Sequence, residues 1–149
     1  MAEPNAIADL IRAAAEARTR AHAPYSTFLV GAALETASGT VVTGCNVESA
    51  SYGLTICAER VALTRAIADG HREFRRLVVT AVSADPTPPC GACRQLLWEL
   101  AGDIDVILAS PDGERVRYRL SQLLPVPFVG GLGARVATRP PARRRRRPD

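Results

Sequence analysis

The stretch TICAERVAL, residues 55–63, places a cysteine and a glutamate two positions apart at the start of an apolar helical pattern. A second stretch, PPCGACRQLLWEL at residues 88–100, likewise begins an apolar helix with two cysteines. The N-terminus of a helix carries partial positive charge and free N–H groups, and both favour thiolate over thiol. The two stretches therefore predict a pair of helices that begin with reactive or metal-binding cysteines.

The rest of the chain surrounds these helices with strands. Hydrophobic periodicity and turn residues predict helices over residues 6–22, 56–69, 90–100 and 121–124, and strands over residues 26–36, 40–47, 76–84, 103–110 and 114–120. This order predicts an α/β fold, a three-layer α/β/α domain with one mixed five-stranded sheet. The initial hairpin makes the first strand pair antiparallel, and the helical connections predict parallel pairs in the middle of the sheet.

The composition is that of a single globular domain. With 149 residues, 47% of them hydrophobic, the chain can bury a core without disulfide support. It has no apolar run of the length that a transmembrane helix needs, and its N-terminus, MAEPNAIADL, lacks a signal-peptide pattern. We therefore expect a cytoplasmic protein without a membrane partner, in which the CxxC spacing indicates metal or redox chemistry.

The net charge of +4 arises at the C-terminal end of the chain. Six of the 19 basic residues and one of the 15 acidic residues lie after residue 138, which leaves a net charge of −1 for residues 1–138. The body of the chain is therefore not a basic nucleic-acid-binding surface, and nucleic acid is not an expected partner. Residues 134–149 end in RPPARRRRRPD, a Pro/Arg-rich tail that we expect to be disordered.

The cysteines of the two helices are expected to meet. In an α/β sheet, successive strand-to-helix turns open on the same edge, so Cys57 can face Cys90 and Cys93. Three converging thiolates suit Zn²⁺ and leave one coordination position for water. A redox pair in the CxxC stretch is one alternative, but it would leave Cys57 without a role. A structural site with four thiolates is another, and it would need Cys45, which we expect to be buried at a strand end.

Glu59 favours a catalytic site over a structural one. It follows Cys57 by two residues in the first helical turn, which is close enough to reach a water molecule on a metal held by that cysteine. Zn²⁺ can lower the pKa of such a water to about 7. A carboxylate beside it that accepts and returns the proton accelerates a reaction by roughly 10²–10⁴-fold. Taken alone, Glu59 would be read as a solvated acid favoured by the helix dipole.

The pattern Cys-x-Glu followed by Pro-Cys-x-x-Cys is typical of zinc-dependent deaminases. Together with NVESASYGLTICAERVAL, PCGACRQLLWEL and APYSTFLVGAAL, it makes the chain resemble the short, homotetrameric cytidine deaminases from about residue 6 to residue 128. The resemblance implies that residues 1–133 form a catalytic domain with one Zn²⁺ per subunit. It also implies hydrolytic deamination of cytidine and deoxycytidine to uridine and deoxyuridine, in pyrimidine salvage.

The resemblance assigns the metal site residue by residue. It implies that Cys57, Cys90 and Cys93 are the zinc ligands and that Glu59 carries protons to N3 of the cytosine ring and to the departing amine. Three thiolates give the metal site a net negative charge, which would weaken the metal as a Lewis acid. By the same likeness, Arg60 hydrogen-bonds the ligand sulfurs and offsets that charge.

The resemblance also implies how the nucleoside is bound. Asn46 and Glu48 would hydrogen-bond the ribose 3′-hydroxyl, and an amide and a carboxylate two residues apart at a strand end can point the same way. A clamp of this kind ignores the 2′ position and accepts ribose or deoxyribose. Phe28 would pack on the pyrimidine, and the backbone of Ala58 would contact the base.

Three further positions would serve a neighbouring subunit, so that the active site is complete only in the oligomer. Ala50 and Tyr52 match positions that reach a neighbour's ribose, and Phe128 matches an aromatic residue that covers a neighbour's pocket. The chain departs from the family at two places. Ser49 replaces a common asparagine after NVE, and Phe128 is followed by VGG where the family commonly has Gly-Pro.

Three other functions stay open at this point. A deaminase of the same fold could act on another aminated pyrimidine nucleoside, such as the antibiotic blasticidin S, although NVES matches the ribose clamp. A nucleic-acid editing enzyme would use the arginine tail to hold RNA or DNA, but the near-neutral body lacks an aromatic and basic groove. A non-catalytic zinc module would have no need of Glu59.

Overall fold

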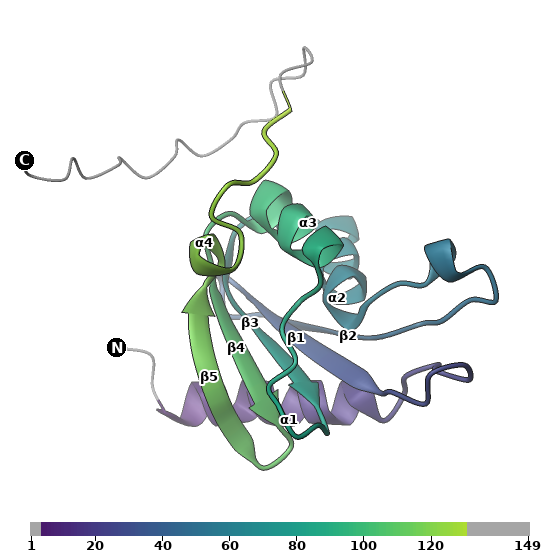
Figure 1. Cartoon of the computed structure of the whole chain (residues 1–149). Coiled ribbons are helices and arrows are strands. Elements are labelled where there is room, and N and C mark those ends of the chain that lie inside the picture. The colour runs from purple at the N-terminus through teal and green to yellow at the C-terminus, as the bar shows by residue number, and fades with distance from the viewer. Residues whose placement is uncertain (1–3, 131–149) are drawn as a thin grey trace, which may run out of the picture.

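The computed structural model describes residues 4–130, and these residues form the predicted three-layer α/β/α arrangement (Figure 1). The elements in chain order are α1 (Pro4–Arg18), β1 (Val30–Thr36), β2 (Val41–Cys45), the 3₁₀ turn η1 (Tyr52–Leu54), α2 (Ala58–Ala68), β3 (Phe74–Ala81), α3 (Gly91–Ala101), β4 (Asp105–Ser110), β5 (Gly113–Arg119) and α4 (Leu120–Leu123). The predicted tail, residues 134–149, lies outside the described residues.

The strand predicted over residues 76–84 ends at Ala81. The two larger errors in the predicted boundaries both adjoin one other segment. The first helix ends at Arg18 and does not continue to residue 22, and the first strand begins at Val30 and not at residue 26. The segment between them contains Pro24, Ser26 and Thr27. Proline removes a backbone donor, and serine and threonine hydroxyls offer the backbone local alternatives to a strand ladder. Residues 19–29 therefore form a loop.

The five strands form one mixed sheet in the order β2-β1-β3-β4-β5. β1 pairs antiparallel with both β2 and β3, β3 pairs parallel with β4, and β4 pairs antiparallel with β5. The prediction of parallel pairs in the middle of the sheet is thus confirmed for β3–β4 and wrong for β1–β3. The connection through α2 does return the chain in the direction of β2, but β1 lies between β2 and β3.

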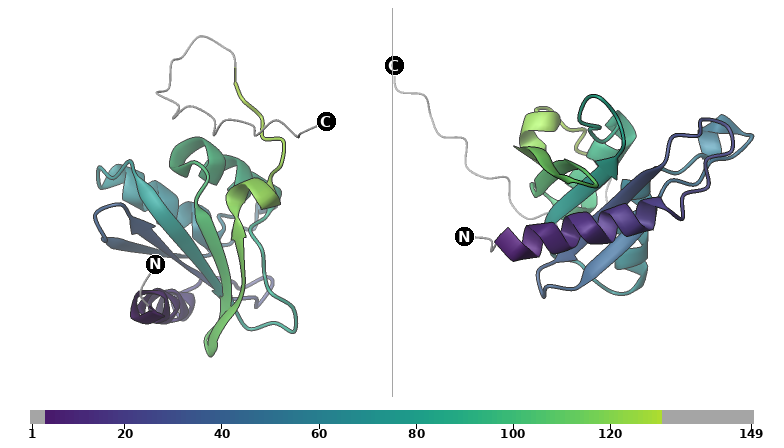
Figure 2. Two further views of the ribbon diagram at one scale, coloured as in Figure 1. Left: turned by 90° about the vertical axis from the view of Figure 1, so that its left-hand side faces the viewer. Right: turned by 90° about the horizontal axis from the view of Figure 1, so that it is seen from below.

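α1 lies across one face of the sheet (Figure 2). Its apolar side chains pack against alternate residues of the central strands, and this cluster comprises Leu10, Ile11, Ala14, Ala33, Val78, Ile107 and Ala109. Gly31 in β1 allows the close approach of the helix, because a Cβ atom at Gly31 would collide with the carbonyl oxygen of Ala14.

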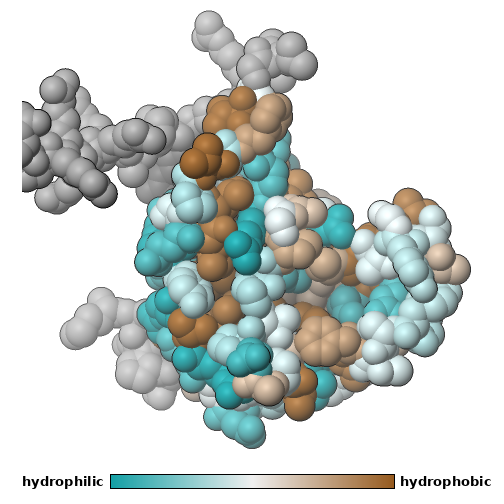
Figure 3. Space-filling model, in the orientation of Figure 1, coloured by the Kyte–Doolittle hydropathy of each residue, from teal (hydrophilic) through white to brown (hydrophobic). Residues whose placement is uncertain are grey.

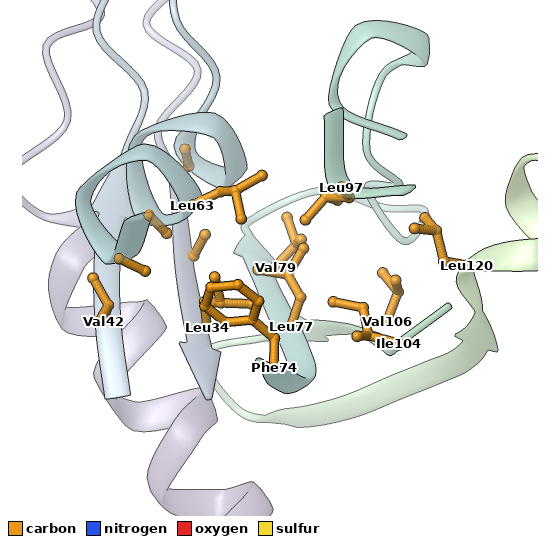
Figure 4. Packing of buried hydrophobic residues seen from close by; sticks show 14 of the residues in the cluster. Leu34, Val42, Leu63, Phe74, Leu77, Val79, Leu97, Ile104, Val106 and Leu120 are labelled. Atoms are coloured by element: carbon orange, nitrogen blue, oxygen red, sulfur yellow. The ribbon is translucent and has the colours of Figure 1, made fainter. Parts of the chain in front are cut away.

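α2 and α3 cover the opposite face, where the larger part of the core is buried (Figure 4). Leu63 and Leu97 from the two helices point toward a row of strand residues that includes Leu34, Leu77 and Val106. Each of these five side chains is at least 99% buried, which stabilises the fold by roughly 1.5–3 kcal/mol per side chain. The core therefore fixes α2 and α3 firmly on the sheet.

The topology brings the N-termini of α2 and α3 to one edge of the sheet. β2 precedes α2 and β3 precedes α3, and both strands run antiparallel to β1. Their carboxyl ends therefore lie at the same edge, and each helix begins there. Within residues 4–130, no helix has the length and the apolar character needed to cross a membrane.

Two loops form an arm that extends from the sheet beside this edge (Figures 1 and 2). The arm consists of residues 19–29, which join α1 to β1, and residues 46–56, which join β2 to α2. Isolated bridges between His22 and Val47 and between Val47 and Ile56 hold the loops together. In the space-filling view the arm stands out on the right and mixes hydrophilic with hydrophobic residues (Figure 3).

Candidate active site

Three cysteine side chains converge where α2 and α3 begin. Cys57 directly precedes α2, Cys90 directly precedes α3, and Cys93 lies in the first turn of α3. The Sγ atoms of Cys57 and Cys90 are 3.8 Å apart, those of Cys90 and Cys93 are 3.5 Å apart, and all three lie within 4.8 Å of one another. Tetrahedral Zn–S bonds of about 2.3 Å place neighbouring sulfurs about 3.8 Å apart, so this spacing fits one Zn²⁺ ion.

The alternative of a four-thiolate site is not formed. Cys45 ends β2, is half-buried where we expected it to be buried, and does not belong to the cluster. All four cysteines are free thiols. Among residues 4–130, the trio at the helix N-termini is the only group of three or more potential metal ligands. Three sulfurs leave the fourth position of a tetrahedral ion open, as catalytic zinc sites do.

The surroundings of Cys57 favour thiolate, whereas hydrogen bonding to Cys57 and burial raise the pKa of Cys93. Hydrogen bonding from Cys93, and then from Cys90 and Arg60, lowers the pKa of Cys57 despite partial burial. Burial opposes the positive charge of Arg60, but hydrogen bonding to Cys57 and attraction to Cys93 raise the pKa of its guanidinium. Nη2 of Arg60 donates a hydrogen bond of 2.8 Å to the carbonyl oxygen of Thr55. Arg60 is therefore anchored with its charge beside the sulfurs.

Glu59 is a buried acid in the first turn of α2. Its exposed fraction is 4%, and burial, reinforced by the negative charge of Cys57, raises its pKa to about 7. An ordinary glutamate near a helix N-terminus is solvated and ionised at neutral pH, so the reading of Glu59 as a surface acid does not hold. A carboxyl group with a pKa near 7 can both accept and donate a proton at neutral pH, which general acid–base catalysis requires.

The base of the arm carries the residues that we predicted to bind the nucleoside. Asn46 is buried, and its side chain accepts a hydrogen bond from the Val30 N–H (2.9 Å) and donates one to the Phe28 carbonyl oxygen (2.8 Å). Glu48 accepts hydrogen bonds from the N–H groups of Tyr25 (2.9 Å) and Ser26 (3.2 Å) and from the Ser26 hydroxyl. The Ser26 hydroxyl is the main cause of the lowered pKa of Glu48.

The remaining predicted residues lie in three different places. Ala58 is the first residue of α2 and is buried beside the cysteines. Ala50 and Tyr52 lie in the outer part of the arm, where Tyr52 is 77% exposed and its ring meets that of Tyr25 edge to face. Phe128 is also 77% exposed and lies on the C-terminal segment beside α3. These three exposed positions do not join the cysteine cluster within one chain.

The sequence analysis missed two sets of contacts. Gln95 was given no site role, yet its amide makes two hydrogen bonds with the backbone of Phe128, at 2.8 and 3.0 Å. Arg94 binds the carbonyl oxygens of Pro89 and Leu123, each at 2.7 Å. The role of Ser26 was also missed, although a serine and a threonine directly before Phe28 are typical of a loop with side-chain-to-backbone hydrogen bonds.

Comparison with known proteins agrees with this geometry. Residues 4–109 match the family model described as the cytidine and deoxycytidylate deaminase zinc-binding region. A cytidine deaminase from Halalkalibacterium halodurans is 48% identical over 80% of this chain and 92% of its own length. The crystal structure of a cytidine deaminase from Burkholderia pseudomallei matches with a TM-score of 0.77 and 48% identity, over 80% of this chain and 97% of that one.

The chain is also similar to a more distant relative with a different named substrate. A blasticidin-S deaminase from Bacillus cereus is 28% identical over 67% of this chain and 76% of its own length.

The fold and the open three-thiolate site beside a buried carboxylate define a zinc-dependent hydrolase of the deaminase class. Within that class, the chain belongs to the cytidine deaminase family, and Zn²⁺ is its cofactor.

Proposed function

We propose that this chain hydrolyses the amino group of both cytidine and deoxycytidine, with Cys57, Cys90 and Cys93 as the zinc ligands and Glu59 as the proton carrier. One observation supports this proposal above all others. A carboxyl group with 4% exposure and a pKa of about 7 adjoins three sulfurs whose spacing suits a tetrahedral metal ion. Neither a redox pair nor a structural zinc site has a use for such a carboxyl group.

The reaction divides between the metal and the residues of the chain. When bound, Zn²⁺ makes a water molecule acidic enough to serve as the nucleophile at neutral pH. Glu59, ionised at the outset, would accept a proton from the attacking water and deliver it to N3 of the cytosine ring. It would then accept the proton of the hydroxyl group added at C4 and donate it to the amine, which leaves as ammonia while C4 becomes a carbonyl. Arg60 offsets the negative charge of the three thiolates, so that the metal keeps its strength as a Lewis acid.

The nucleoside binds between the helix N-termini and the base of the arm. In this proposal Phe28 packs on the pyrimidine, and the backbone of Ala58 contacts the base. Asn46 and Glu48 hydrogen-bond the 3′-hydroxyl of the sugar. Because this clamp has no contact with the 2′ position, we expect cytidine and deoxycytidine to be comparable substrates, and free cytosine to be a poor one. Such an enzyme serves pyrimidine salvage in the cytoplasm, where its thiols stay reduced.

The active form is a homotetramer with shared active sites. Tyr52 and Phe128 are each 77% exposed, and Leu54 and Val126 are 70% and 86% exposed. Exposed large apolar residues in such number are typical of a surface that binds another protein. In this proposal Ala50, Tyr52 and Phe128 complete the site of a neighbouring subunit. Sedimentation of the purified protein at several concentrations tests the assembly independently of its activity.

A blasticidin-S deaminase is the second candidate, because one relative with that name covers 67% of this chain. Incubation of the zinc-loaded protein with cytidine, deoxycytidine, blasticidin S and cytosine distinguishes the candidates by ultraviolet absorbance and ammonia release. We expect rapid turnover of both cytosine nucleosides and little of the other two compounds. Turnover of blasticidin S alone would contradict the proposal, as would turnover of free cytosine as fast as that of cytidine.

A further inference from the structure

A strained residue lies directly before Phe28. Thr27 has a φ of +56°, and it is the only residue other than glycine with a positive φ in the described part of the chain. Because threonine is branched at Cβ, this left-handed conformation is sterically unfavourable. Strained backbone persists only where its surroundings over-determine it, and such places collect at functional sites. The contacts on both sides of Thr27 therefore show what holds this strained conformation in place.

On one side of Thr27, a single hydroxyl group links two residues of the proposed nucleoside site. The Ser26 hydroxyl donates a hydrogen bond to Glu48 Oε1 and accepts one of 3.0 Å from the N–H of Phe28. The N–H of Ser26 donates to the other oxygen of Glu48, Oε2, at 3.2 Å. Ser26 thereby holds both the plane of the Glu48 carboxylate and the backbone N–H of Phe28.

On the other side, Asn46 holds the rest of the Phe28 backbone. Its amide nitrogen donates to the Phe28 carbonyl oxygen at 2.8 Å, and its amide oxygen accepts from the Val30 N–H at 2.9 Å. Phe28 is thus held through its N–H by Ser26 and through its carbonyl oxygen by Asn46. The backbone that carries the aromatic ring can shift only if one of these contacts breaks.

The carboxylate of Glu48 has room for about one more donor. A carboxylate offers about four acceptor positions, and the Tyr25 N–H, the Ser26 N–H and the Ser26 hydroxyl occupy three. Ser26 and Glu48 also line a hollow of about 340 Å³ at the arm, together with Tyr25, Ser49, Tyr52 and Thr55. One free acceptor beside a hollow suits a single hydroxyl group of a ligand.

We propose that Ser26 is a positioning residue that couples Glu48 to Phe28, so that the sugar hydroxyl and the pyrimidine are recognised as one rigid unit. This inference rests on the proposed function, which places the 3′-hydroxyl at Glu48 and the base at Phe28. Without the Ser26 hydroxyl, the carboxylate can rotate and the Phe28 N–H loses its acceptor. Recognition of the 3′-hydroxyl then weakens, while the chemistry at the zinc site is unchanged.

The test compares deoxycytidine with 2′,3′-dideoxycytidine, which differs from it by the 3′-hydroxyl alone. We expect Ser26→Ala to raise the KM for deoxycytidine by more than about tenfold and to change kcat little. The variant should weaken the binding of dideoxycytidine much less, through the Phe28 N–H alone, so that the preference for the 3′-hydroxyl falls about tenfold. Ser26→Thr retains the hydroxyl and is expected to restore most of that preference.

Ser121 supplies a matched control. Its N–H and hydroxyl also bind one carboxylate, Asp103, at 2.8 and 3.1 Å, but at the start of α4. Ser121→Ala is expected to keep the wild-type preference for the 3′-hydroxyl. The inference is overturned if Ser26→Ala keeps that preference, if Ser121→Ala lowers it as much, or if Ser26→Thr behaves like alanine. A wild-type protein that does not deaminate deoxycytidine would instead overturn the proposed function, and this inference with it.

Discussion

The helix N-termini and the arm hold their functional side chains by different means. Ala58 and Glu59 are 0% and 4% exposed, because α2 packs on the sheet through a continuous apolar core. In the arm, Tyr25 and Phe28 are 54% and 39% exposed, and side-chain-to-backbone hydrogen bonds hold the loop in place. Under the proposed function, the chemical step would therefore depend on helix packing, and substrate binding would depend on polar contacts that can change without unfolding the domain.

Removal of the metal tests the role of the helix N-termini, and it is expected to have the largest effect on the rate of deamination. We expect a chelator to abolish deamination, and added Zn²⁺ to restore it, because without the metal no water molecule becomes acidic enough to attack the ring. Metal analysis and turnover measured on the same samples check this. Cys90→Ser is expected to resist restoration, while Ser26→Ala in the arm keeps its full zinc content. Deamination by thoroughly metal-free protein would contradict the assignment.

The buried carboxyl group predicts an unusual dependence of stability on pH. Burial raises the pKa of Glu59 in the folded protein to about 7 from an ordinary value of 4.5. Between these two values the folded state binds a proton that the unfolded state releases, so stability falls as the pH rises. Between pH 5 and pH 8, metal-free wild-type protein should lose about 2–3 kcal/mol of unfolding free energy relative to Glu59→Gln.

Denaturant unfolding of both metal-free proteins across this pH range checks the prediction. The comparison between the two proteins removes the contributions of the cysteines, which they share. A difference that stays constant from pH 5 to pH 8 would show that Glu59 is ionised throughout.

Substitutions at two glycines can distinguish the packing of α2, beside the metal site, from the packing of α1 on the other face of the sheet. A Cβ at Gly44 would lie 2.5 Å from the carbonyl oxygen of Ala58, and a Cβ at Gly31 would collide with that of Ala14. We expect either glycine-to-alanine substitution to destabilise the fold by about 1–3 kcal/mol. Only Gly44→Ala should also weaken zinc binding, because it displaces α2, whose N-terminus positions Cys57.

Unfolding midpoints and zinc competition with a chromophoric chelator measure the two effects separately. Equal losses of zinc affinity in both variants would mean that the metal site responds to stability in general, and not to the position of α2.

The smallest expected effect concerns the C-terminal segment. Gln95→Ala removes both hydrogen bonds to the backbone of Phe128 and should free that segment from α3. We expect faster proteolysis near Phe128 and a loss of turnover of less than about tenfold, because the hydrogen bonds are neutral and partly solvated. Gln122→Ala, whose side chain binds the Arg119 N–H at 2.7 Å, is the matched control. Equal proteolysis of the two variants would contradict this role.

The fold was largely predictable because local patterns agree with it. The apolar periodicities gave the helices and strands, and the βα connections gave the shared edge at which Cys57 and Cys90 meet. The pairing of β1 with β3 was not predictable from the same rules. A helical crossover fixes the direction of the two strands that it joins, but it does not say whether a third strand lies between them.

The parts of the site that lie within one helical turn were predictable, because spacing along the helix determines which side chains are close together. Cys57 and Glu59 share one helical turn, so their proximity follows from the sequence alone. The contacts of Ser26 and Gln95 were not predictable, because each joins segments that are far apart in the chain. The burial that raises the pKa of Glu59 was also beyond the sequence, since it depends on how α2 packs on the sheet.

The most direct test of the account is the turnover of cytidine by wild-type protein and by Glu59→Gln, with zinc measured in both. We predict equal zinc contents, rapid loss of cytidine absorbance with the wild type, and a rate lower by about 10²–10⁴-fold with the glutamine variant. Comparable rates in the two zinc-loaded proteins would show that Glu59 does not carry the proton. That result would contradict the mechanism while leaving the fold and the metal site in place.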